Sequence, residues 1–153
     1  YTITFVCFNA YINLPCSYFV GISLMVDLCL SYKVFKPSLW TGLLGKMISQ
    51  GLWKEIKPVL LELNGHPALW NLPIYLEAWN KMLSEPFTRA SIPVTSEQKN
   101  SCFKALSLIK SCPIAADLDL KTLTGECKRI GLDALATELI EPLIRLTDLT
   151  ESI

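Results

Sequence analysis

Hydrophobic residues recur every three or four positions along most of the chain, which is the spacing of one face of an α-helix. The pattern predicts helices over residues 17–32, 38–50, 52–64, 72–83, 95–109, 120–130 and 132–146. Most breaks between these segments are only a few residues long, so consecutive helices must run antiparallel. The sequence therefore predicts an all-α fold of stacked antiparallel helical hairpins, a segment of an α-solenoid in which each hairpin buries its apolar face against its neighbours.

Several helix ends carry recognisable signals. Pro37 suits the first turn of a helix, where its missing N–H would have no partner anyway, and Gly51 suits a left-handed stop. Thr95 and Gln98 have the spacing of a capping box, in which each side chain satisfies the backbone N–H of the other residue. Asp119 and Gly131 are placed to cap and to close the helix over residues 120–130.

Prolines interrupt the pattern at three further places. Pro58 lies inside the apolar pattern of residues 52–64 and should kink or restart that helix. The segment Ser84–Val94 holds two prolines and shows no period, so it is predicted to be a connector. Pro142 is expected to bend the last helix.

The first third of the chain is unusually apolar. Residues 1–13 alternate imperfectly and fit either a strand or a distorted helix, while residues 17–32 are too continuously apolar to show a face and predict a buried helix. We therefore treat residues 1–33 as an apolar segment of uncertain assignment and residues 34–153 as the helical-hairpin domain. Because the chain begins with Tyr1 and not Met, we expect a fragment or a processed product.

The stretch Leu14–Leu30 is long enough to raise a second interpretation, a membrane-anchored helical protein. Asp27 near its end, Pro15 within it and the lack of basic anchors on its flanks argue against a span. A buried helix explains the same residues, and no membrane contact is expected.

Composition excludes two classes of protein. Hydrophobic residues make up 51% of the chain and charged residues 18%, which excludes a disordered chain and suggests that some apolar surface is covered by neighbours. The 14 basic and 14 acidic residues cancel, and the basic residues are scattered. A nucleic-acid interface needs clustered positive charge, so nucleic acid is not an expected partner.

The six cysteines show no close pair such as C-x-x-C. Three of them fall at apolar positions of helical patterns. Buried free thiols in a reducing compartment are favoured over a secreted disulfide framework.

No pattern in the chain indicates catalytic chemistry. His66 is the single histidine and has no partner at metal-ligand spacing, and its place before Pro67 is typical of a turn. The glycines of residues 42–45 lie inside a helical pattern and lack the Lys-Ser/Thr ending of a phosphate loop. The carboxylates occur singly, as on solvated helix faces. We expect no catalytic, cofactor-binding or metal-binding residues; a hydrolase using His66 and a thiol is the weakest alternative.

Three residues are candidates for contact with a protein partner. Trp70 lies in a proline-flanked stretch and could either pack or anchor a partner, since aromatic residues are enriched at interface hot spots. Phe87 and Arg89, in the predicted connector, are the next candidates. Packing is the commoner fate of such aromatic rings.

The stretch over residues 60–120 resembles the carboxy-terminal region of the Rod (rough deal) family of kinetochore-associated proteins. The resemblance is a series of spaced positions and covers roughly the last two thirds of the chain. They include Gly65, Pro67, Leu69, Trp70, Ala78, Trp79, Pro86, Phe87, Ala90, Ser91, Pro93, Cys102, Cys112, Pro113 and the run Asp117–Leu120.

The resemblance implies a non-catalytic scaffold segment of a long α-solenoid, cytoplasmic and at the kinetochore in mitosis, in a complex of the corona and the spindle assembly checkpoint. It implies protein partners, namely Zwilch-like and Zeste-white-ten-like subunits and a dynein adaptor, and no cofactor. A related α-solenoid subunit of an endoplasmic-reticulum vesicle-tethering complex is the alternative, because fold reasoning alone does not separate the two.

Overall fold

The computed structural model describes residues 19–145, and every regular element in that range is a helix. The all-α class is therefore confirmed for the described residues. The prediction for residues 1–13 lies outside them. The chain divides into two compact units, residues 1–78 and residues 79–153, with the boundary inside one helix.

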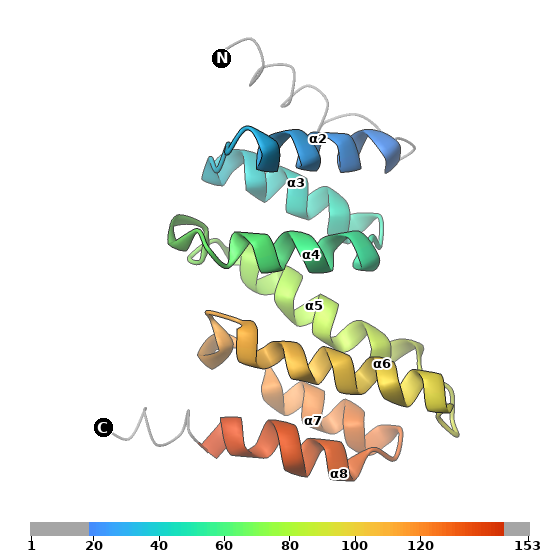
Figure 1. Cartoon of the computed structure of the whole chain (residues 1–153). Helices are drawn as coiled ribbons and strands as arrows, with labels where there is room; N and C mark the ends of the chain where they lie inside the picture. Colours follow the sequence, from blue (N-terminus) through green and yellow to red (C-terminus); the bar gives the residue numbers. More distant parts are fainter. Residues whose placement is uncertain (1–18, 146–153) are drawn as a thin grey trace. The chain divides into compact units, whose positions relative to one another are not determined.

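The first unit contains α2 (Phe19–Ser31), α3 (Pro37–Ser49), α4 (Trp53–Leu63), the short 3-10 helix η1 (Pro67–Leu69) and the beginning of α5 (Pro73–Arg89). Helix α3 packs against α2, α4 and η1, and Figure 1 shows it between its two helical neighbours. Short connections join these helices, so each pair forms an antiparallel hairpin.

Helix α3 supplies much of the core of the first unit. Its buried residues are Leu39, Trp40, Leu43, Leu44 and Met47. Pro37 begins the helix as predicted, and the chain leaves it through Gly51, whose φ of 67° lies in the left-handed region that only glycine enters without strain.

Helix α2 differs from the buried helix that its composition predicts. Ile22, Met25, Val26 and Cys29 are buried at helical spacing, whereas Leu24 is 58% exposed. The helix therefore buries one face only. Because apolar residues such as Leu24 also occur on its outer side, the helical spacing of the buried face could not be recognised in the sequence.

Pro58 does not end or restart its helix, because α4 runs continuously through it from Trp53 to Leu63. Ile56, Val59, Leu60 and Leu63 are buried around it. Burial of this face outweighs the loss of one backbone hydrogen bond, which would cost about 3 kcal/mol in an exposed helix.

The second unit contains the rest of α5, then α6 (Ser96–Ser107), the 3-10 helices η2 (Leu108–Ser111) and η3 (Ala115–Asp117), α7 (Leu120–Arg129), α8 (Asp133–Leu135) and the π-helical segment η4 (Ala136–Ile140). Both predicted caps are confirmed. Thr95 and Gln98 form the capping box of α6, and the Asp119 side chain accepts the N–H of Thr122 at the start of α7. Gly131, at a φ of 82°, closes α7.

The predicted connector Ser84–Val94 is wrong in its first half. Helix α5 continues to Arg89 and carries Pro86 inside it. Trp79, Met82, Leu83 and Phe87 are buried along one side of this helix at spacings of three and four residues. The helical spacing of these residues is present in the sequence, but Pro86 within it led to the prediction of a connector.

Phe103 lies on the outer side of α6, where its side chain is 49% exposed. The buried positions of α6 and η2 are Cys102, Ala105, Leu106 and Ile109. Adjacent helical residues point about 100° apart, and on α6 this rotation carries Phe103 from the buried face of Cys102 and Leu106 to the solvent side.

The bend expected at Pro142 takes the form of a widened turn. Residues 136–140 are π-helical, and residues 141–145 return to α-helix. Proline has no N–H to donate to the preceding turn and its ring crowds the carbonyl there, which explains a π-turn directly before it. This segment packs against α6, α7 and α8.

Candidate interaction surface

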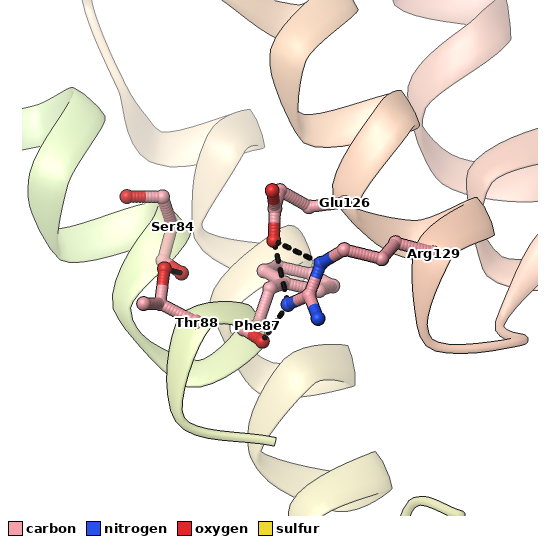
Figure 2. A network of polar contacts seen from close by, with 5 residues as sticks. All are labelled: Ser84, Phe87, Thr88, Glu126 and Arg129. Carbon is pink, nitrogen blue, oxygen red and sulfur yellow. Dashed lines mark hydrogen bonds and ion pairs between the residues drawn. The ribbon is translucent and has the colours of Figure 1, made fainter. Parts of the chain in front are cut away.

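The last turns of α5 and α7 are held together by Arg129. Its Nη2 donates to the carbonyl oxygen of Phe87 across 3.0 Å, and its Nε and Nη2 both contact Oε2 of Glu126, at 3.1 and 2.9 Å (Figure 2). The Phe87 carbonyl is one of the last in α5 and also accepts the N–H of Ala90 at 3.3 Å. The C-terminal end of a helix carries partial negative charge, so a cation is favoured there. Sequence analysis did not identify Arg129.

The connection between α5 and α6 is organised by one acceptor, Oε1 of Gln98. It accepts the backbone N–H of Ser91 at 3.1 Å, the hydroxyl of Ser91 at 2.8 Å and the backbone N–H of Thr95 at 3.1 Å. The N–H of Gln98 in turn donates to Oγ1 of Thr95. The cap of α6 and the path of the preceding connection therefore depend on the same side chain.

Two of the predicted partner contacts lie on the last turn of α5 and point in different directions. The ring of Phe87 is fully buried, so in this structure it packs inside the protein. Arg89 is exposed, with its guanidinium paired to the carboxylate of Glu85 one turn earlier. Of the two, only Arg89 has its side chain at the surface.

Trp70, the third candidate, belongs to the first unit and directly follows η1. Its ring is half-buried, and its Nε1 is shielded without a hydrogen-bond partner. A buried donor of this kind normally pairs with protein or water. Part of the Trp70 ring therefore remains at the surface.

A further group of apolar side chains lies at the surface, and none was a predicted contact. These residues are Leu24, Tyr32, Leu61, Ile92 and Phe103. Ile92 is 69% exposed in the connection before α6, and Phe103 lies on α6 itself. A helical projection centred on Cys102 and Leu106 places Phe103 on the outer side of the helix.

The four described cysteines, Cys29, Cys102, Cys112 and Cys127, are buried and carry free thiols. Burial raises the pKa of each thiol to about 11, because the charged thiolate loses solvation inside the protein. A nucleophilic cysteine needs the opposite shift. Cys7 and Cys16 lie outside the described residues.

The ring of His66 stacks on Phe35, with ring centroids 3.5 Å apart and planes at 20°. Phe35 also stacks on Trp40, whose Nε1 donates to the carbonyl oxygen of Val34 at 2.7 Å. His66 thus belongs to an aromatic group that closes the end of the α3–α4 hairpin, the turn role that its position before Pro67 indicated.

Neither a metal cluster nor a membrane span is found in the part of the chain that the structure describes. No three His, Cys, Asp or Glu residues there come close enough to hold a metal ion. None of the helices within residues 19–145 combines the length and the apolar character that a membrane crossing requires.

Comparison with known proteins gives a consistent result. Residues 18–145 match the family model of the Rough deal protein C-terminal region. Kinetochore-associated protein 1 of Homo sapiens is 30% identical over 117 residues, which cover 76% of this chain and 5% of that protein. Its Mus musculus counterpart matches with the same identity and coverage. No solved structure matches the chain significantly.

Proposed function

The chain belongs to the Rough deal C-terminal family, and we propose that it is a non-catalytic scaffold segment of a kinetochore complex. The match over residues 18–145 is the observation that carries the proposal, since it includes every helix that the structure describes. The chain spans about 5% of the length of its curated relatives, so the role of the whole protein enters here as part of the proposal.

The chemistry of the described residues supports a binding role. Apart from the thiols and the buried Tyr75, the ionisable side chains of the described residues are at least partly exposed, and the buried thiols have raised pKa values. Catalytic groups usually combine a sheltered site with a pKa shifted toward neutrality. Exposed apolar residues such as Ile92 and Phe103 are instead the kind of side chain that a protein partner covers.

The expected partners are protein subunits resembling Zwilch and Zeste-white-ten, together with a dynein adaptor, in a complex of the kinetochore corona that serves the spindle assembly checkpoint. The helical hairpins are proposed to be part of a longer α-solenoid in which residues 34–153 form one hairpin array. Trp70 and Arg89 are proposed contacts, and Phe87 supports the turn that carries Arg89.

Affinity capture from mitotic cell extract tests this function. The tagged chain should retain Zwilch-like or Zeste-white-ten-like subunits, identified by mass spectrometry. Capture of endoplasmic-reticulum tethering subunits alone would contradict the kinetochore assignment.

Matched variants connect the captured subunits to the surface. Arg89→Glu and Trp70→Ala should each reduce the captured amount several-fold, whereas Lys121→Glu, an exposed charge reversal on α7, should leave it unchanged. Circular dichroism should show equal helical content for all variants, so that a loss of capture reports the surface and not the fold.

A further inference from the structure

We propose that Ser91 is a phosphorylation site for an arginine-directed serine kinase, and that its phosphorylation opens the N-terminal cap of α6. The inference goes beyond the proposed scaffold role and does not depend on it. It rests on the position of Ser91 between α5 and α6 and on the three hydrogen bonds that converge on Gln98.

The segment around Ser91 has the features that a kinase needs in a substrate. Ser91 is exposed and lies outside regular structure, so its hydroxyl can enter an active site after a small local opening. Arg89 stands two residues before it and Ile92 follows it, both with exposed side chains. Basic residues before the acceptor are read by acidic pockets of arginine-directed kinases.

The Arg89 guanidinium is available for this recognition at little cost. Its contact with Glu85 joins two residues one turn apart on the same helix, with the Arg89 side chain 69% exposed and the Glu85 side chain 12% exposed. Pairs at this helical spacing contribute only about 0.3–0.5 kcal/mol. Arg89 is also the last residue of α5, where a helix frays most readily.

Ser101 provides an internal comparison. It also has a basic residue, Lys99, two positions before it and is exposed. However, it lies within α6, and its hydroxyl donates to the carbonyl oxygen of Glu97 at 3.1 Å. A helical backbone cannot adopt the extended form that a kinase binds without loss of its hydrogen bonds, so Ser101 should not be modified.

The reaction itself is an ordinary phosphoryl transfer from ATP. Oγ of Ser91 attacks the γ-phosphorus, a new Oγ–phosphorus bond forms, and the bond from that phosphorus to the bridging oxygen of ADP breaks. The hydroxyl proton passes to the catalytic carboxylate of the kinase, and ADP leaves.

The consequence for the protein follows from the hydrogen bonds of Ser91. Its hydroxyl now donates to Oε1 of Gln98 at 2.8 Å or to the carbonyl oxygen of Pro93 at 3.0 Å. A phosphate at this position has lost that donor and carries a charge of about −1.5 to −2 at neutral pH. It therefore repels Oε1, the atom that also accepts the N–H of Thr95, and the capping box should open.

The test uses the intact chain, ATP and the catalytic subunit of an arginine-directed serine kinase, with phosphates located by mass spectrometry. Ser91 should be modified and Ser101 should not. Arg89→Ala should slow modification at least tenfold, and Ser91→Ala should abolish it. An intact chain that takes no phosphate on Ser91 overturns the proposal, even if a peptide of residues 86–96 is modified.

Thermal unfolding tests the second part of the proposal, that phosphorylation of Ser91 opens the cap of α6. Phosphorylation should lower the melting midpoint by about 2–4 °C, the effect of losing one cap in a domain of this size. In a Gln98→Leu variant the acceptor that the phosphate repels is already absent, so phosphorylation should lower the midpoint no further. A midpoint that stays constant or rises in the unsubstituted chain would overturn the uncapping.

Discussion

Arg129 and Phe87 are 42 positions apart in the sequence, yet the guanidinium of the first donates to the backbone carbonyl of the second across 3.0 Å (Figure 2). The bond joins the last turn of α7 to the last turn of α5. Because the acceptor is a backbone atom at a helix C-terminus, the interaction requires a cation at position 129 but no particular side chain at position 87.

Replacement of Arg129 by alanine should therefore destabilise the protein by about 1 kcal/mol, the contribution of a charged hydrogen bond that is partly open to solvent. Urea unfolding followed by circular dichroism measures the change. Arg89→Ala is the matched control, because Arg89 also pairs with a carboxylate on its own helix, that of Glu85. It should change the free energy of unfolding by less than about 0.5 kcal/mol. Equal effects would show that the bond to Phe87 contributes nothing.

Replacement by alanine should have opposite effects at Gly125, inside α7, and at Gly131, just after its end. Gly131 has a φ of 82°, so Gly131→Ala should destabilise the protein by about 1–2 kcal/mol. Gly125 lies within the helix, and an added Cβ there meets no atom within 4 Å, so Gly125→Ala should stabilise by about 0.5–1 kcal/mol. The thermal unfolding midpoints of the two variants test both directions. A lower midpoint for Gly125→Ala would contradict the open space around that position.

The hydroxyl of Tyr75 should contribute measurably to the stability of the first unit. It donates to Oδ1 of Asn64 at 2.5 Å, and the ring of Tyr75 is buried. Tyr75→Phe keeps the ring and removes the donor, so we expect a loss of about 1 kcal/mol in unfolding free energy. Tyr32→Phe is the control, since the side chain of Tyr32 is mostly in solvent and its hydroxyl should be neutral to stability.

The buried thiols should react slowly in the folded protein. A pKa of about 11 in place of 9.0 lowers the thiolate fraction at pH 8 about 100-fold, and burial slows the reagent further. In a Cys7→Ala/Cys16→Ala background, labelling with a thiol reagent at pH 8 should be slow without denaturant and rapid in urea. Rapid labelling of the folded chain would contradict the assigned burial.

The same shift makes stability depend on pH in the alkaline range. The folded protein holds its thiol protons to about pH 11, whereas the unfolded chain releases them near the ordinary value of 9.0. The stabilising contribution is therefore complete below pH 9 and is lost as the pH rises toward 11, at up to about 1.4 kcal/mol per pH unit for each thiol. Urea unfolding from pH 8 to 10.5 should show this decline, and Cys127→Ala should make it less steep.

Sequence alone determined the features that depend on neighbouring residues. The all-α class, the capping box of Thr95 and Gln98, the Asp119 cap and the glycine stops at residues 51 and 131 are all confirmed. Each depends on contacts within about one helical turn, so the residues that decide it lie together in the chain.

Tertiary structure decided the rest. Pro86 remains inside α5 because Phe87 and Leu83 are buried beside it, and Phe103 is exposed because α6 turns Cys102 and Leu106 inward. The Arg129–Phe87 bond forms because α7 returns to the end of α5. An apolar residue reads the same in a sequence whether it faces a core or a partner, and only the packing of distant helices distinguishes the two.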